Sequence, residues 1–108
     1  MTTSVRFNTK GVGEKRVLAF DFSADLATGE TLTGTVTSVT ITVVAGTDGA
    51  AAAMLAGGNG IDASATKYLV PITGGIDGCD YDVVVLGART TTATKWLDLG
   101  GILPVRAQ

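Results

Sequence analysis

The chain has no histidine and only one cysteine, Cys79, among its 108 residues. Histidine is the commonest general base near neutral pH and the commonest metal ligand, so its absence removes the usual basis of both kinds of site. A single cysteine cannot form a disulfide within the chain, and no Lys, Arg or His flanks Cys79 to activate its thiol. We therefore expect Cys79 to be a small, partly buried residue at the start of a strand.

Charge of either sign and long apolar runs are also scarce. Charged residues make up 17% of the chain, the net charge is −2, and the eight Lys and Arg are scattered without forming a basic patch. No apolar run approaches the roughly 18 residues of a membrane-spanning helix, and the N-terminus MTTSVRFNTK lacks the apolar core of a signal peptide. The sequence thus predicts a protein that folds in the cytosol and binds neither nucleic acid nor membrane.

What the chain does have is a large apolar fraction, 45%, arranged in short alternations of apolar and polar residues. A period of two is typical of strands with one buried face. The expected buried faces comprise Leu18, Phe20 and Phe22; Val39, Ile41 and Val43; Tyr68, Val70 and Ile72; Tyr81, Val83 and Val85; and Leu97, Leu99, Leu103 and Val105. About seven such strands and no strong helix predict an all-β, antiparallel sandwich of the immunoglobulin or fibronectin III type.

Three places along this pattern are open to two interpretations. Within residues 31–44, the positions expected to face the core change from even-numbered to odd-numbered near Thr37 or Ser38. This change indicates either a bulge or a break between two short strands. Pro71 cannot donate a ladder hydrogen bond, so its strand lies at a sheet edge or ends there. Residues 50–55, with four alanines, are interpreted as strand and loop, with one helical turn as the alternative.

The first thirteen residues are polar and contain two glycines, and we interpret residues 1–13 as a flexible arm preceding a single domain of residues 14–108. Val5 and Phe7 alternate with polar neighbours, so this arm has the pattern of a strand that pairs within the chain or along a neighbouring subunit. On this interpretation, deleting residues 1–13 leaves the thermal melt of the domain nearly unchanged and weakens assembly.

The segment GGIDGCDY, residues 74–81, leads from a turn into an apolar strand. In immunoglobulin-type sandwiches, a tyrosine near the start of the penultimate strand packs inward and bonds through its hydroxyl to upstream backbone. We predict that Gly74, Gly75 and Gly78 form the turn, that Ile76 plugs it, and that Tyr81 is this tyrosine corner. The alternative is an ordinary strand tyrosine with a solvated hydroxyl.

An ordered set of motifs resembles a group of small tailed-phage virion proteins. These motifs are FDFSADLATGET, then TGGIDGCDY, a Thr-Thr hairpin and the C-terminal LPV, and the resemblance covers roughly residues 14–106. The alanines at 50–53 depart from that group's pattern. The resemblance implies an immunoglobulin-like fibre–tail adaptor found in the virion, and it supplies no catalytic residue and no cofactor.

Acidic residues are the remaining candidates for chemistry, because Asp77, Asp80 and Asp82 lie close together. A glycosidase needs two carboxylates facing each other across a cleft, whereas Asp80 and Asp82 flank Tyr81 and point outward from a strand. Oxygen ligands at Asp77 and Asp80 could converge on calcium, although no EF-hand spacing is present. We predict a non-enzymatic protein that needs no cofactor.

Trp96 is the residue whose position most invites a partner. If Leu97 and Leu99 face the core, then Trp96, Ile102 and Pro104 face outward as an apolar contact strip; the alternative is a half-covered Trp on a small sheet. The function expected is a structural component that joins tail and fibre proteins in several copies, made in the host cytoplasm and located in the virion. The alternatives are a capsid decoration protein and a carbohydrate or cell-surface recognition module.

Overall fold

A computed structural model describes residues 3–107, with side chains from residue 6 onward. The chain is all-β, with principal extents of 42 × 25 × 20 Å. Two short 3-10 helices, η1 (Ser23–Asp25) and η2 (Ala51–Met54), interrupt eight strands. The strands are β1 (Thr3–Arg6), β2 (Lys10–Gly11), β3 (Arg16–Asp21), β4 (Ser38–Ala45), β5 (Gly60–Ile61), β6 (Lys67–Ile72), β7 (Asp80–Arg89) and β8 (Trp96–Arg106).

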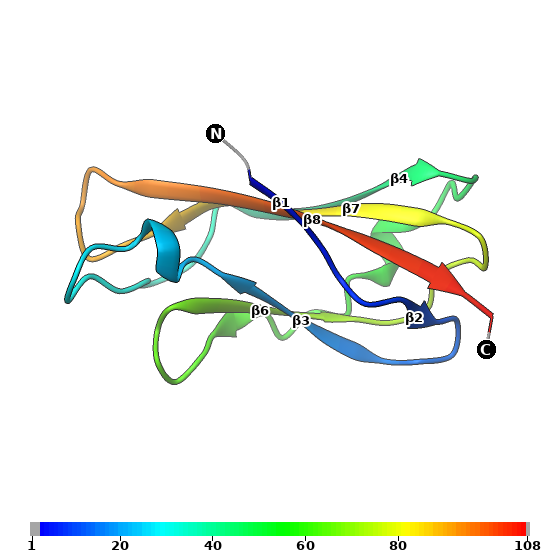
Figure 1. Cartoon of the computed structure of the whole chain (residues 1–108), viewed down its shortest axis with the longest axis horizontal. Coiled ribbons are helices and arrows are strands. Elements are labelled where there is room, and N and C mark those ends of the chain that lie inside the picture. Colours follow the sequence, from blue (N-terminus) through cyan, green and yellow to red (C-terminus); the bar gives the residue numbers. More distant parts are fainter. Residues whose placement is uncertain (1–2, 108) are drawn as a thin grey trace.

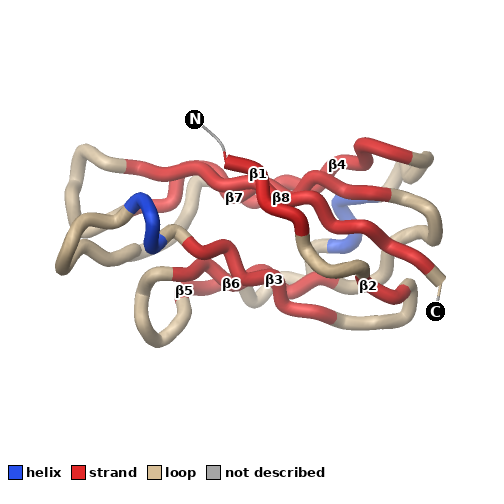
Figure 2. The backbone as a smooth tube through the Cα atoms, in the orientation of Figure 1, coloured by secondary structure: helices blue, strands red, loops and turns tan. Residues whose placement is uncertain are grey.

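The strands form two sheets that lie one above the other (Figures 1 and 2). The larger sheet has the order β1-β8-β7-β4, and β2 also pairs with β8 beyond the end of β1. The smaller sheet has the order β3-β6-β5. β7 and β8 form an antiparallel hairpin in the larger sheet, while β3 and β6 pair antiparallel in the smaller one. The expectation of a two-layered all-β fold is therefore confirmed.

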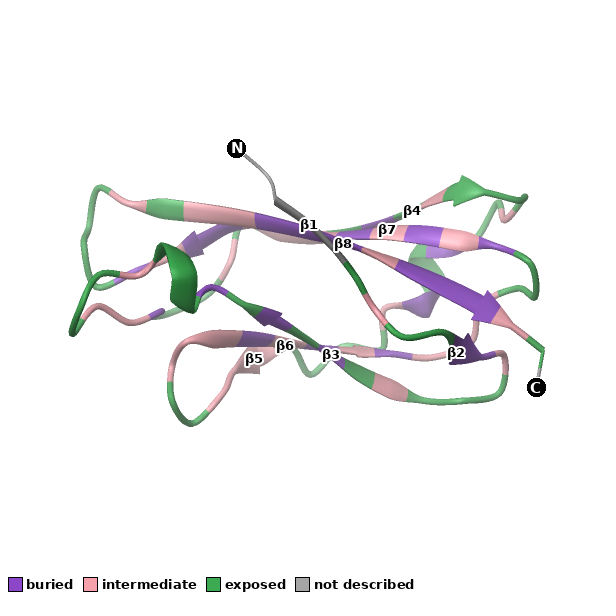
Figure 3. Cartoon of the chain, viewed as in Figure 1, coloured by how far each residue is buried: buried purple, intermediate pink, exposed green. Residues whose placement is uncertain are grey.

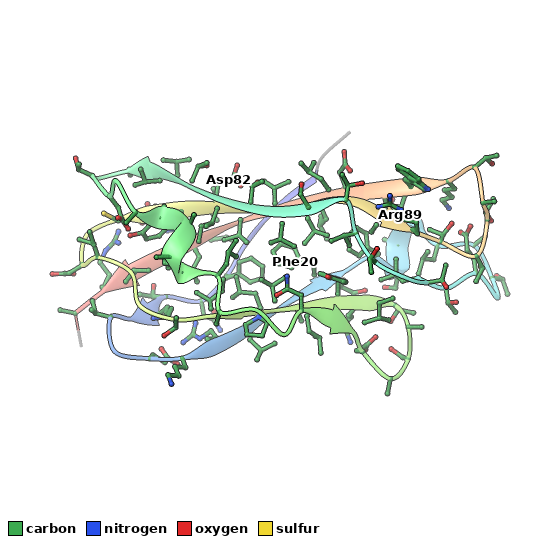
Figure 4. All side chains as sticks on the ribbon, turned by 180° about the vertical axis from the view of Figure 1, so that it is seen from behind. Phe20, Asp82 and Arg89 are labelled. Carbon is green, nitrogen blue, oxygen red and sulfur yellow. The ribbon has the colours of Figure 1, made fainter. Side chains whose placement is uncertain are left out.

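The core lies between the two sheets and is built by the predicted alternation (Figure 3). β7 has a strict pattern in which every second residue from Tyr81 to Val85 is buried. Figure 4 shows Phe20 between the sheets and Asp82 on the outer side of the larger sheet. The most completely buried apolar side chains are Phe20, Phe22, Val70, Ile72, Tyr81, Val83, Val85, Leu103 and Val105.

The N-terminal segment does not behave as the loosely held arm that its composition predicts. β1 and β2 both pair in parallel with β8, so the sandwich is not wholly antiparallel. The amide of Phe7 donates to the carbonyl of Ile102 at 2.9 Å, and its ring meets that of Phe20 edge-on at 5.3 Å. Backbone pairing with β8 thus holds a segment that has few apolar side chains of its own, and the domain boundary at residue 13 stays a prediction for truncation to test.

Two of the open interpretations are settled by packing. Residues 51–54 form a 3-10 turn with Ala51 and Met54 buried, so the strand interpretation of this segment is wrong and the helical alternative is correct. Near Thr37 the structure shows a break, since β4 begins only at Ser38. An isolated bridge from Leu32 to Thr90 holds the segment before it.

The third open interpretation concerned Pro71. β6 is the central strand of the smaller sheet, so the edge alternative is wrong, whereas the strand does end at Ile72, directly after Pro71. Pro71 nevertheless lies past the two residues where β5 pairs with β6, namely Leu69 and Tyr68. On the side of β6 that faces β5, the missing N–H of Pro71 therefore leaves no strand-pairing hydrogen bond unmade.

Candidate contact site

Tyr81 is fully buried near the start of β7, and both hydrogen-bonding capacities of its hydroxyl are used. The hydroxyl accepts a bond from the amide of Ile76 at 3.0 Å and donates one to Oδ2 of Asp48 at 2.7 Å. Burial, followed by the bond to Asp48, raises the pKa of Tyr81. The bond from Tyr81 to upstream backbone has the geometry expected from the sequence, whereas the contribution of Asp48, 33 residues away, was not foreseen.

The turn before Tyr81 uses the three predicted glycines in left-handed conformations, with φ of 72° at Gly74, 103° at Gly75 and 87° at Gly78. At Gly75 there is also a lack of room, because a Cβ would lie 3.0 Å from Met54 Cε and 3.1 Å from a methyl of Val105. Ile76, in contrast, does not plug the turn: the residue is 45% exposed, and it takes part through its backbone, whose amide donates to Tyr81 and whose carbonyl accepts from the amide of Cys79 at 3.1 Å.

The predicted strip of Trp96, Ile102 and Pro104 is not a continuous contact surface. Trp96 is 57% exposed, and the Arg89 guanidinium covers one side of its ring at 3.8 Å from the centroid. Ile102 is partly buried and Pro104 is buried, because β8 has β7 on one side and β1 and β2 on the other. Trp96 and Pro104 are also eight residue steps apart on one strand, roughly 26 Å. Of the three, only Trp96 is available to a partner.

The other predicted contact residues were Val5 and Phe7. Val5 lies in β1 beside Gly101, and its side chain is outside the described part of the chain. Phe7 is partly buried and packs against the core cluster through Phe20. Phe7 is therefore engaged within its own domain.

An apolar surface that the sequence reasoning missed lies on the outer side of the smaller sheet. Val17 pairs directly with Pro71, and Ala19 pairs with Leu69, on the face opposite the buried Leu18, Phe20 and Val70. We call these four residues, Val17, Ala19, Leu69 and Pro71, the outer apolar face. Val17, the most prominent of them, is 56% exposed. The signal was in the sequence, because strand alternation assigns these residues to one side once β3 and β6 are known to pair.

One end of the outer apolar face opens into a shallow hollow of about 270 Å³. Val17, Ala56, Pro71 and Ile72 supply apolar walls, and Lys15 and Arg16 lie at the rim with Thr73. The opposite end of the face is bounded by the paired residues Asp21 and Lys67. The arrangement has the general form of a protein contact, with an apolar centre and a charged border.

At the far end of the sandwich, Glu30 joins the loop before β4 to the hairpin between β7 and β8. Its carboxylate accepts bonds from the Lys95 ammonium at 2.7 Å, from the Thr92 hydroxyl and from the amide of Ala27 at 2.8 Å. These bonds, the one from Lys95 first, lower the pKa of Glu30 from its usual 4.5 to about 2. The carboxylate of Glu30 thus adds to the backbone bonds that join these two loops, whose residues Glu30 and Lys95 are 65 positions apart.

Because the pKa of Glu30 is lower in the folded protein than in the unfolded chain, its contribution to stability is complete above pH 4.5 and disappears as the pH falls toward 2. We expect Glu30→Gln to lower the melting temperature at pH 7. Between pH 4.5 and 2, the melting temperature of this variant should fall less than that of wild type. Asp82→Asn, on the outer side of the larger sheet, is the matched control. Parallel pH profiles for Glu30→Gln and wild type would refute the assignment.

Two of the three acidic residues considered for catalysis or calcium, Asp77 and Asp80, make structural bonds. Asp77 accepts the amide of Ala107 at 2.8 Å, and Asp80 pairs with Arg106 at 3.0 Å. Among the residues that the structure describes, no three His, Cys, Asp or Glu side chains gather where they could hold a metal ion. The arrangement around Asp77 and Asp80 thus ties the C-terminal residues to the start of β7.

Comparison with known proteins adds no relative to these observations. No protein-family model, no curated protein and no solved structure matches the chain. Within residues 3–107, no helix is long and apolar enough to span a membrane. The candidate site carried forward is the outer apolar face.

Proposed function

We propose that this chain is an immunoglobulin-like structural protein of a tailed-phage virion, which joins tail and fibre components through protein–protein contacts without catalysing a reaction. The strand order supports the immunoglobulin type. β8-β7-β4 corresponds to the G-F-C order of immunoglobulin domains, and β3-β6-β5 corresponds to B-E-D. Tyr81 occupies the tyrosine-corner position of such a domain, near the start of the penultimate strand. The departure is the N-terminal strand, which joins β8 in the G-F-C sheet.

The virion role is supported by the resemblance of the FDFSADLATGET and TGGIDGCDY segments to small tailed-phage proteins. The observation that carries a role in assembly is the outer apolar face, which leaves Val17, Ala19, Leu69 and Pro71 on the outside of the smaller sheet. An exposed apolar group with a charged border is typical of a surface that a partner covers. A neighbouring virion protein with an apolar ridge and an acidic residue opposite Lys15 would fit it, since Arg16 is already paired with Glu14 at 2.8 Å.

Antibodies against the purified protein, detected with gold on negatively stained phage particles, test the location. Gold at the tail or fibre base is the expected result. Gold on the head would replace this proposal with capsid decoration, and particles without gold would overturn the virion role.

The outer apolar face is tested with Val17→Lys, since its exposed side chain contributes little to the fold. We expect a wild-type melt with severalfold lower incorporation into particles, measured by complementing a deletion of the gene. Ile76→Lys is the matched control, because Ile76 is also an exposed apolar residue but lies outside this face. Normal incorporation of Val17→Lys would place the contact elsewhere.

A further inference from the structure

β4 is the edge strand of the larger sheet, and its pairing with β7 is regular from Ser38 to Val43, with an irregularity only between Val43 and Ala45. β4 pairs with β7 on one side. Within residues 3–107, no backbone hydrogen bond connects β4 to any segment other than β7. The strand has the sequence SVTITVVA, eight residues without a charge or a proline. Backbone N–H and C=O groups on such an edge form a template for another strand.

The two edges of the smaller sheet differ from β4. β3, at the edge of the smaller sheet, begins with Arg16 and ends with Asp21, and β5 has only two residues. Charged ends and short length are two of the devices by which proteins prevent edge-to-edge pairing. β4 has eight residues and no charged end, and its one pairing irregularity lies near its end, between Val43 and Ala45.

We infer that β4 pairs antiparallel with β4 of a second copy of this chain, across a two-fold axis at Ile41. Residues directly opposite each other in a sheet must point to the same face, and the register centred on Ile41 satisfies this condition. It places Thr40 opposite Thr42 on the outer face and Val39 opposite Val43 on the inner face. The larger sheets of two copies become one continuous sheet.

A second copy fits this edge because the strand is complementary to itself. No like charges meet at any position, since β4 has no charged residue. Val39 and Val43, which are only half-buried at the rim, gain apolar neighbours, and the exposed Thr40 and Thr42 form cross-strand threonine pairs. η2, which lies against β4, presents the small exposed residues Ala52 and Ala53. A strand from an unrelated chain would need its own uncharged residues and its own apolar and threonine positions in the same register.

Sedimentation velocity over a concentration series tests the inference with the full chain. We expect wild type to form a reversible dimer, and Thr40→Glu/Thr42→Glu to weaken it at least tenfold, because the introduced carboxylates of the two copies then face each other across the pairing. Thr33→Glu/Thr94→Glu is the matched control: it gives the same change of net charge, from −2 to −4, at exposed threonines outside β4. A wild type that remains monomeric at millimolar concentration, or equal weakening in both variants, would overturn the inference.

A second measurement does not depend on how well the charged variants fold. Cross-strand neighbours have Cα atoms about 4.5–5.5 Å apart, within the range of a disulfide. Thr40→Cys/Thr42→Cys should therefore form a covalent dimer under mild oxidation. Wild type, whose buried Cys79 is the only thiol, should not cross-link. If Thr40→Cys/Val44→Cys, which is out of register, cross-links as readily, the proposed pairing is refuted. Neither measurement depends on the virion role, so the two proposals can fail separately.

Discussion

Tyr81→Ala should lower the free energy of unfolding by about 3–5 kcal/mol, the usual cost of removing a large buried aromatic ring. The expected effect lies at the upper end of this range because two further groups lose their partner. Truncation leaves the amide of Ile76 and the carboxylate of Asp48 without the hydroxyl that they bond at 3.0 and 2.7 Å. Denaturant unfolding monitored by far-UV circular dichroism provides the measurement.

Tyr81→Phe separates the ring from the hydroxyl. This variant keeps the packing and removes both hydrogen bonds, so we expect a loss of about 1–2 kcal/mol and an unchanged fold. Tyr68→Phe is the matched control, because Tyr68 is a buried strand tyrosine outside this turn. A Tyr81→Ala variant as stable as wild type would show that Tyr81 does not anchor the turn, and equal effects in the two Phe variants would show that its hydroxyl has no special role.

Deletion of residues 1–13 should unfold the domain or lower its stability by roughly 3 kcal/mol or more. The deletion removes β1 and β2 from the side of β8 and takes Phe7 away from Phe20. It also removes Lys10, which is fully buried and donates to the carbonyls of Gly74 and Gly11 at 2.6 and 2.7 Å. Thermal and denaturant melts of the purified truncated chain are the measurements.

Two single substitutions divide this effect into its causes. Phe7→Ala tests the aromatic contact, and Lys10→Met tests the bonds to Gly74 and Gly11, with about 1–3 kcal/mol expected for acceptors left without a donor. Asn8→Ala, at an exposed position of the same segment, should leave the melt unchanged. If the truncated chain melts like wild type, residues 1–13 do not stabilise the domain and are a loosely held arm.

Lys10 illustrates why the N-terminal segment could not be interpreted from its composition. A lysine in a polar, glycine-bearing stretch is usually exposed to solvent. Its burial here depends on hydrogen-bond acceptors from other parts of the chain. The carbonyl of Gly74 lies 64 residues away along the chain. Burial lowers the pKa of Lys10, and the nearby carboxylate of Glu14 opposes this effect. Only the tertiary fold brings such groups together.

The same distinction holds for the surfaces. The sequence placed Trp96, Ile102 and Pro104 on one face of their strand, but the burial of Pro104 follows from the strands on both sides of β8. The outer apolar face needed the pairing of β3 with β6, which brings Val17 opposite Pro71. Sequence alternation determines which side of a strand is apolar, whereas neighbouring strands determine whether that side is covered.

By itself, the sequence determined the all-β class, the alternating core of β3, β4, β6, β7 and β8, and the glycine turn that leads to Tyr81. These features depend on the two-residue period of a strand and on the left-handed conformations that glycine adopts, which are local properties of the chain. Only the tertiary structure decided the parallel pairing of β1 and β2 with β8, the 3-10 turn at Ala51–Met54 and the partnership of Tyr81 with Asp48. The strand pairings and the bond from Tyr81 to Asp48 join residues distant in sequence, and the 3-10 turn buries Ala51 and Met54 in the core. The free energy of all three comes from burial and hydrogen bonds that exist only after the two sheets have packed.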